Sequence, residues 1–524
     1  MGETGQSHNS TFAGPEAGEV PRRRSWSKWV FAGLVVFYAA TVAGWFYWDH
    51  KADRMLRSEV EQVRSAGEPL DWAEFAPAPV PVEQNAAPLY DRAWDSLQRR
   101  YRHIEDEIDW EEGKGLELLL DSFAGYPDLR QEHADDLEAL LEMSQMSLKL
   151  CREARDRPKA YWEADYSRPG LELRLPPLRP YRQLAVLLRV AAVTAHERGR
   201  DDEAVAYIRD IIHLSRSVQE LPTLIVSLVS SGISETASLT TEEIIAELRV
   251  GDSSGAAART DVLALMEELL DAQALHKSLT RGMVSERSIQ YDTCERVLKG
   301  EFTTDLGPGQ LSTARNLMKV ISPVFKVDQA LLLRSANVYV RATKAEDYPS
   351  AKRILSHSPD YRHIFTGNGL HGVAHPLLYT LHPALGAVFR SHWDTVATRR
   401  MAAVALALRL FELDNGRRPE SLDELVPEYL SEVPRDPFDP DAHIRYRPDD
   451  TPVLYCIGPD GVDDGGMAGL SGRHSYEPPD VLFYLNGDRP RPEPDRQEPA
   501  STPSTKPVPA SRPRQPDKRP PEGT

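Results

Sequence analysis

The longest apolar run of the chain covers residues 29–48 and contains no charged residue. At about 1.5 Å of rise per residue, a helix of this length spans roughly 30 Å, which matches the hydrocarbon core of a bilayer. Aromatic residues stand at both ends of the run, as they do at membrane–water interfaces. Arg22, Arg23 and Arg24 precede it, whereas mixed charges follow from Asp49. The pattern predicts a single-pass transmembrane helix at 29–48 with a cytoplasmic N-terminus.

Two other interpretations of this run compete with a membrane anchor. A cleaved signal peptide would have a shorter apolar core and small residues at its exit, but this run ends in WFYW. A buried helix of a soluble core is disfavoured because the uncharged run is long and follows an arginine cluster. We therefore expect a retained signal-anchor in the inner (cytoplasmic) membrane, with the bulk of the chain extracytoplasmic, in the periplasm.

Apolar residues recur at helical spacing between residues 85 and 344, and we expect a helical domain over 85–390. The clearest pair of stripes covers 184–220, with Gly199 ending the first helix and Asp201 or Asp202 capping the second. Further helices are expected at 223–249, 259–299 and 312–344. The segment 49–84 between anchor and domain has a charged, helix-compatible stalk and a proline-rich spacer.

The hairpin AAVTAHERGRDDEAVAYIRDII resembles one tetratricopeptide-type unit, with Gly199 and Ala204 at the positions of close contact. That family requires a second copy at a period of about 34 residues, and the sequence has none. We therefore expect a hairpin of an ordinary helical bundle.

The pattern changes at residue 392. A strong helix is predicted over 393–413, ended by Gly416, and a short helix follows over 421–430, where Ser421 and Glu424 form a capping box. Three β-type runs come next, at 444–447, 453–457 and 481–485. Together they predict a small α+β module with a three-stranded antiparallel sheet over 392–488. The fold class is therefore mainly α, with polar or proline-rich, disordered tails at 1–28 and 489–524.

Composition narrows the range of functions. The net charge is −18, with 80 acidic against 62 basic residues, which disfavours nucleic-acid binding. The three cysteines, Cys151, Cys294 and Cys456, have no metal-type spacing, and we expect them to be small buried apolar residues.

Several motif matches occur outside the structural context that their chemistry needs. Residues 251–255, GDSSG, match G-x-S-x-G, but the preceding EEIIAELRV is helical, so we expect Ser253 in a linker between helices. His371 and His375 have the i, i+4 spacing of a metal pair, yet Gly372 and Pro376 argue against a helix there. The overlapping G-x-G-x-x-G at 367–372 lacks a βαβ unit. We expect no catalytic or cofactor-binding residue; a hydrolase using Ser253 or the histidine-rich loop at 357–392 is a third class.

The stretches LFELDNGRRP (410–419), VPRDPF (433–438), IRYR (444–447) and YCIGPDGVDDGG (455–466) occur in that order. This region resembles the C-terminal globular domain of the major pseudopilin of type II secretion. The resemblance implies a calcium site in which Asp460 and Asp480 are ligands, with Asp463 and Asp464 as alternatives and backbone carbonyls completing the shell.

The chain departs from pseudopilins where filament assembly requires a match. Its apolar helix has no acidic residue, SWSKW stands in place of a processing site, and more than 300 residues separate the anchor from the module. The whole chain resembles bacterial single-pass membrane proteins that carry such a module. We expect a non-enzymatic binding or scaffold protein of the cell envelope with protein partners there. The alternative is a component of a type II secretion or pseudopilus-like apparatus.

Overall fold

The computed structural model of the chain describes residues 26–104, 115–167, 170, 175–299, 301, 308–357, 375, 377, 385–467, 480–487 and 489. The fold is mainly helical with one small antiparallel sheet, as the sequence predicts. The first helices are α1 (Trp26–Ser65), α2 (Ala87–Ile104), α3 (Leu116–Gly125), α4 (Pro127–Glu132), α5 (Ala134–Arg155), α6 (Arg179–Glu197), α7 (Asp201–Val218) and α8 (Leu224–Ile244). The later ones are α9 (Arg259–Leu270), α10 (Gln273–Lys299), α11 (Pro308–Ala342), α12 (Tyr348–Ser356) and α16 (Gly386–Asn415). Short 3-10 helices lie at η1 (Trp72–Phe75), η2 (Val82–Gln84) and η4 (Leu422–Leu425).

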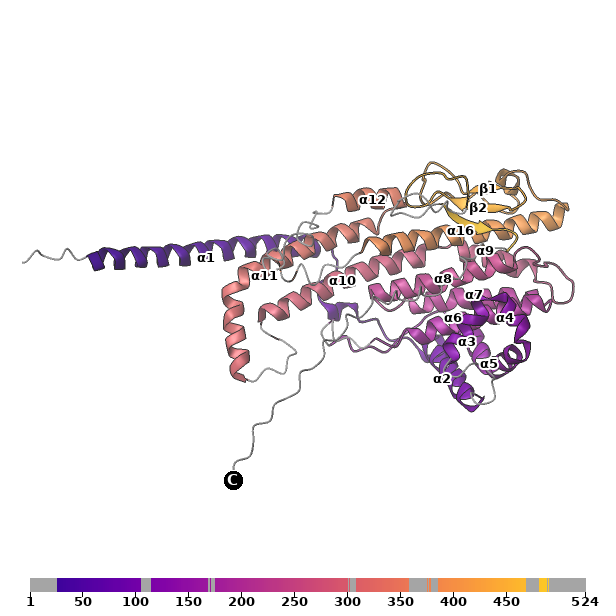
Figure 1. Cartoon of the computed structure of the whole chain (residues 1–524), viewed down its shortest axis with the longest axis horizontal. Helices are drawn as coiled ribbons and strands as arrows, with labels where there is room; N and C mark the ends of the chain where they lie inside the picture. Colours follow the sequence, from indigo (N-terminus) through magenta and orange to yellow (C-terminus); the bar gives the residue numbers. More distant parts are fainter. Residues whose placement is uncertain are drawn as a thin grey trace, which may run out of the picture.

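The predicted anchor and the first part of the predicted stalk form one uninterrupted helix, α1. Its apolar first half projects away from the rest of the protein and has no buried residue in its most apolar window (Figure 1). Large apolar side chains such as Phe31 and Phe37 are fully open to the surroundings. The helix is long and apolar enough to cross a membrane.

The second half of α1 is held along its length by α11. Asp49 pairs with Lys326 at 2.9 Å, and Glu59 pairs with Arg334 at 2.7 Å. The paired residues lie 277 and 275 positions apart in sequence, so the two helices run in the same direction with an offset that changes by only two residues. Between these ion pairs lies an apolar seam of Leu56, Val63, Ala330 and Leu333. The anchor helix is thus fixed to the body instead of hanging from it.

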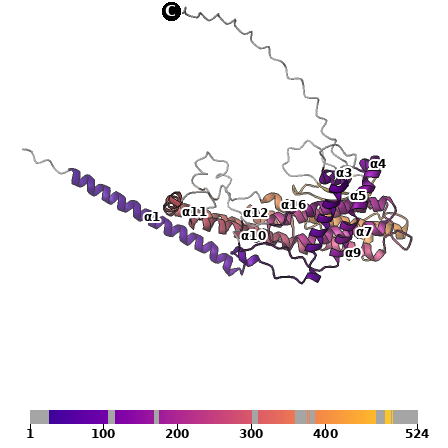
Figure 2. The same cartoon turned by 90° about the horizontal axis from the view of Figure 1, so that it is seen from below.

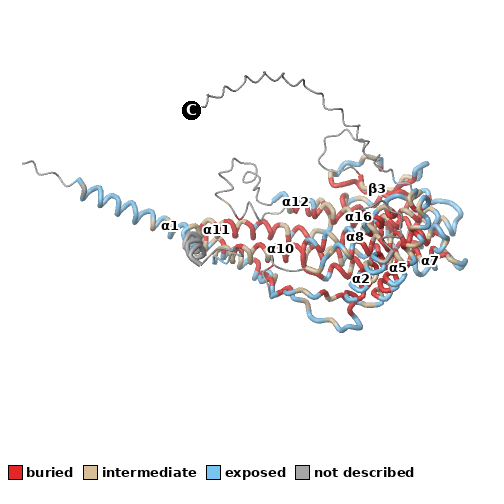
Figure 3. The backbone as a smooth tube through the Cα atoms, turned by 60° about the horizontal axis from the view of Figure 1, so that its bottom comes forward, coloured by how far each residue is buried: buried red, intermediate tan, exposed pale blue. Residues whose placement is uncertain are grey.

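The body is a stack of helices in which each packs on the next. Helix α6 packs on α7, α7 on α8, and α8 on both α10 and α16, while α10 carries α11. Buried backbone runs along α8, α10 and α16, in contrast to the exposed first half of α1 (Figure 3). The hairpin of α6 and α7 turns at Gly199, whose φ of 71° is the left-handed conformation expected at a helix end.

The small sheet covers α16 and shares the core of the helical body. Strands β1 (Arg445–Arg447), β2 (Val453–Cys456) and β3 (Val481–Tyr484) pair antiparallel in that order, each within one residue of its predicted ends. Leu454 pairs with Phe483, and both are buried in one apolar cluster that extends back to Tyr90 of α2. Helix α16 begins at Gly386, crosses the expected boundary near residue 390, and packs on α8 and α9. The predicted module is therefore continuous with the helical body.

Three local predictions are wrong. Neither Asp201 nor Asp202 caps α7, because the N-cap is Arg200 and no side chain makes a cap bond; Asp201 pairs with His196 and Arg249 instead. Ser421 makes no side-chain cap bond, and the segment after it is a single 3-10 turn. The Glu424 carboxylate instead accepts the backbone N–H of Glu420 at 2.6 Å and pairs with Arg417 at 2.5 Å. The helix expected over 259–299 is also divided, into α9 and α10.

Arg399 of α16 explains that division. Its buried guanidinium donates to the carbonyls of Leu269 and Asp271, each at 3.0 Å, and to the hydroxyl of Ser234 at 2.8 Å. It also donates to the carbonyl of Glu268. The side chain therefore satisfies the free carbonyls at the end of α9 and ties α8, α9 and α16 together. Burial lowers the pKa of Arg399 to about 10.

Replacing this arginine should destabilise the body strongly. Arg399→Leu leaves several buried carbonyls without a donor, and we expect a loss of about 3 kcal/mol or more in the free energy of unfolding. The measurement is the thermal midpoint of the full chain in detergent. Arg353→Leu, at an exposed position of α12, is the matched control and should change the midpoint little. Equal midpoints for the two variants would contradict this role.

Candidate functional site

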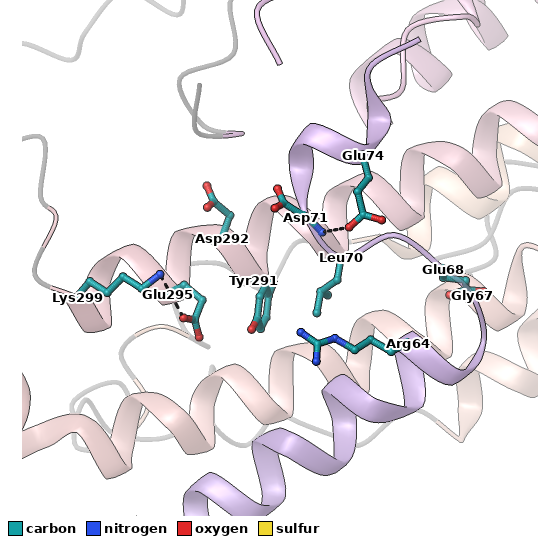
Figure 4. Close-up of a pocket in the computed structure, with 10 residues that line it drawn as sticks. All are labelled: Arg64, Gly67, Glu68, Leu70, Asp71, Glu74, Tyr291, Asp292, Glu295 and Lys299. Atoms are coloured by element: carbon teal, nitrogen blue, oxygen red, sulfur yellow. Dashed lines mark hydrogen bonds and ion pairs between the residues drawn. The ribbon is translucent and has the colours of Figure 1, made fainter. Parts of the chain in front are cut away.

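The first concave region lies where the anchor helix meets the body. It is a pocket of about 610 Å³ between the chain that leaves α1 and the exposed side of α10 (Figure 4). Five carboxylates and two cations line it: Glu68, Asp71, Glu74, Asp292, Glu295, Arg64 and Lys299. The pocket is therefore acidic overall.

Most of these carboxylates are already engaged within the protein. Asp71 and Glu74 form a capping box at the start of η1. Glu68 pairs with Arg287 at 2.7 Å and with Lys344 at 2.9 Å. Burial alone would raise the pKa of Glu68, but the hydrogen bonds from these two cations outweigh burial and lower it. The acidic pocket is a structural joint, because its charges hold the chain instead of facing a ligand.

Arg287 is the central residue of this joint. It is one of the largest fully buried side chains, and it donates to Glu68, to Asn337 of α11 at 3.0 Å, and to the Pro69 carbonyl at 3.2 Å. One side chain of α10 thus binds both α11 and the segment that leaves α1. The direction of the anchor relative to the body is fixed at this point.

The second concave region is basic. A pocket of about 480 Å³ lies between the end of α5 with its following loop, the C-terminal part of α7 and the start of α10. Its cations are Arg155, Arg157, Lys159, Arg216, Lys277 and Arg281, against the carboxylates Asp156, Glu220 and Asp271. A local excess of positive charge is notable in a chain with a net charge of −18. Such a concave positive surface attracts anions.

The cations of the basic pocket differ in how far they are already bound. Arg155 and Arg157 donate to the carbonyls of Ala206 and Val82, both at 2.8 Å, which fixes their positions. The exposed Lys159 and Lys277 have no ion pair in the part of the chain that the structure describes. The pocket therefore combines two ammonium groups that are unpaired among the described residues with guanidinium groups whose positions are fixed.

The histidine that lines the basic pocket, His213, is neutral near pH 7. His213 lies between the Tyr90 hydroxyl at 2.7 Å and the Arg157 carbonyl at 3.0 Å. Burial lowers the pKa of His213, so it adds no charge near neutral pH. The Nε atom of Arg216 is buried without a hydrogen-bond partner among the described residues. The basic pocket therefore provides an anion with positive charge and with one hydrogen-bond donor, the Nε of Arg216, that is not yet used.

Asp480, one of the two principal calcium ligands implied by the resemblance, is committed to backbone groups. Its two carboxylate oxygens accept the N–H groups of Asp464 at 3.2 Å and of Gly466 at 2.8 Å. Gly466 has a φ of 66°, and a Cβ there would collide with the ring of Tyr455. Asp480 therefore closes the loop by itself.

The other aspartates of the loop are also partnered. Asp463 pairs with Arg445 at 3.1 Å, and Asp460 accepts the N–H of Val462 at 3.0 Å. The described residues contain no group of three or more potential metal-ligating side chains, and residues 468–479 of this loop lie outside them. The calcium site stays a prediction of the resemblance.

The remaining motif residues are placed as follows. Ser253 is exposed in the turn between α8 and α9, so the prediction of a linker is confirmed. His375 binds Asp328 at 2.6 Å, while His371 and the glycine motif at 367–372 lie outside the described residues. The three cysteines are free and buried, as predicted.

Sequence reasoning missed a buried histidine pair. His392 of α16 and His276 of α10 join through Nε2 and Nδ1 at 2.9 Å, beside Trp393. Burial lowers the pKa of His392 to about 3, with a smaller effect from His276. No motif or spacing marks this pair, because its members are 116 residues apart.

Comparisons with models of protein families, with curated proteins and with solved structures find no match to the chain.

The histidine pair should make stability depend on pH. The folded-state pKa of His392, about 3, lies below the unfolded value of about 6.5, so its contribution to stability is lost as pH falls from 6.5 towards 3. His392→Gln removes this titration. Between pH 7 and pH 5 the wild type should lose about 2 kcal/mol relative to the variant, measured as the difference between their denaturation midpoints. A difference that does not change with pH would refute the assignment.

Proposed function

We propose that the protein is a membrane-anchored, non-enzymatic binding protein of the bacterial cell envelope, with its body outside the cytoplasm. The observation that carries the proposal is the division of α1 into two halves. The first half exposes apolar side chains to the surroundings, and the second is bound to α11. An exposed apolar helix of this length needs lipid around it, whereas the charged residues of the second half need polar partners and water.

The orientation across the membrane follows from charge. Arg22, Arg23 and Arg24 precede the apolar run, and basic residues that flank a transmembrane helix stay in the cytoplasm. The body after Asp49 is then extracytoplasmic. The joint at Arg287 holds it in a fixed direction relative to the anchor helix, which suits a scaffold.

The basic pocket gives this scaffold a ligand class. Lys159 and Lys277 have no ion pair among the residues that the structure describes, and Arg155, Arg157 and Arg216 are held in place by hydrogen bonds to backbone carbonyls. We infer that the ligand presents carboxylate or phosphate groups, because guanidinium and ammonium groups bind both. The neutral His213 leaves this preference unchanged near neutral pH.

A second candidate function is a component of a type II secretion or pseudopilus-like apparatus. The order of α16, η4 and the three strands favours it, since this order carries the sequence resemblance. The burial of α16 between α8, α9 and the sheet argues against a filament subunit, because that helix has no free face along its centre. Co-purification of the full chain with secretion components would favour this candidate; their absence would favour the first.

The topology can be tested in cells whose outer barrier is permeabilised. We expect protease to digest the chain after Asp49 while the inner membrane is intact, because the arginine cluster retains the N-terminus inside. A tag after Thr524 reports the result, and a cytoplasmic protein is the control. Survival of the tag until the inner membrane is opened would contradict the orientation.

Anion binding can be tested with pyrophosphate as the probe. It should raise the thermal midpoint of the full chain in detergent above that in chloride at equal ionic strength, because a ligand that binds only the native state stabilises it. Replacement of Lys159 and Lys277 by glutamine should remove most of the rise. Lys299→Gln, in the acidic pocket, is the matched control. Equal responses in all variants would reduce the effect to non-specific ion binding.

A further inference from the structure

Helix α11 changes direction at Pro323. A proline inside a helix cannot donate its i→i−4 hydrogen bond and bends the helix away from its ring. After Pro323, α11 follows α1. Before it, the helix runs across the direction of α1 in Figure 1 and is seen nearly end-on in Figure 2. We call residues 308–322 the arm.

The arm leaves α11 at the level where the apolar half of α1 ends. The indole Nε1 of Trp45 donates to the carbonyl of Val320 at 2.7 Å, and Ser322 donates to Asp49 at 3.2 Å. Trp45 belongs to the aromatic group at the end of the apolar run, where indoles lie at a membrane–water interface. If α1 crosses the bilayer along its normal, an element that crosses α1 here lies parallel to the membrane surface.

The sequence of the arm suits that position. At 100° per residue, one half of the helix carries the apolar residues Leu311, Ala314, Leu317, Met318, Val320 and Ile321, and the other half carries Arg315 and Lys319. No acidic residue occurs between Asp305 and Asp328, although the chain has 80 acidic residues in all. The arm is cationic through Arg315 and Lys319. Amphipathic, basic helices of this kind bind at the boundary of headgroups and acyl chains.

The side chains at the described end of the arm are exposed, as expected for a surface that contacts something outside the chain. Val320 is 61% exposed, and Lys319 beside it is exposed as well. Most large apolar residues of α11 beyond the proline are buried, among them Phe325, Leu332 and Leu333. The change from buried to exposed apolar residues occurs at the bend.

We propose that the arm is an interfacial helix that lies on the bilayer surface and that its positive charge attracts anionic lipid headgroups, with the exposed Lys319 at the described end. The inference rests on the proposed membrane anchor and extends it, because it gives the protein a second contact with the same membrane. A transmembrane helix alone leaves the body free to rotate and tilt. An arm fixed to α1 through Val320 and Ser322 would hold it upright.

The test measures contact with lipid at single positions. The full chain is reconstituted in nanodiscs of phosphatidylcholine and phosphatidylglycerol, with or without brominated acyl chains. Cysteine is introduced and labelled with an environment-sensitive fluorophore at three exposed sites: Val320→Cys in the arm, Val36→Cys in the apolar half of α1, and Leu263→Cys in α9. The native cysteines are buried, and labelling of the wild type gives the background.

We expect brominated lipid to quench the probes at positions 36 and 320 and to leave position 263 unquenched. Arg315→Glu with Lys319→Glu should weaken quenching at 320 without changing it at 36, and discs of phosphatidylcholine alone should do the same. Quenching at position 36 but not at position 320 would refute the interfacial arm and leave the proposal of a membrane anchor intact. Absence of quenching at 36 would overturn the anchor itself. Protection of position 320 from both water and lipid would assign the arm to a protein partner and also refute the proposal.

Discussion

One half of helix α1 is apolar and the other half is charged, so a single helix must be stable in two different environments. The rest of the structure depends on this constraint. Its apolar half can be stable only where water is absent, while its second half carries Asp49, Asp53 and Glu59 and needs polar partners. Helix α11, which runs beside it in the same direction, provides these partners through Lys326 and Arg334. The boundary between the two solvents therefore falls at a defined point of the molecule, near Trp45 and the bend of α11.

Two buried arginines carry this constraint into the body. Arg287 joins α10 and α11 to the chain that leaves α1, and Arg399 joins α16 to the end of α9 and to α8. Each guanidinium binds carbonyls or amides of segments distant in sequence, so each fixes helix ends that apolar packing alone would leave unsatisfied. Between the two arginines, α10 packs on α8 and α8 packs on α16, which carries the small sheet. The orientation of the anchor relative to the sheet is therefore fixed by packing.

The sequence was sufficient where local chemistry decides the structure. Short runs of β-type residues predicted the three strands, and glycine predicted the left-handed helix ends at Gly199 and Gly416. It was insufficient where a distant side chain decides. Arg399 binds the carbonyls at the end of α9 from 128 residues away, and Ser421 makes no cap bond although the sequence has the pattern of a capping box. The basic pocket has no local signal either, because Lys159 and Lys277 meet only through the packing of α5, α7 and α10.

Fixation of the anchor helix to the body is the central claim, and cross-linking in native membranes tests it most directly. Cysteines at Glu59 and Arg334, whose side chains pair at 2.7 Å, should be joined rapidly by a short bis-maleimide. Cysteines at Glu59 and Lys319 should not, because Lys319 adjoins Val320, whose carbonyl binds Trp45, and Trp45 lies 14 residues, or about 21 Å of helix, before Glu59 on α1. Linked peptides are identified by mass spectrometry. Rapid linkage of the first pair alone is the predicted result; equal linkage of both pairs, or of neither, would contradict a fixed parallel pairing of α1 with α11.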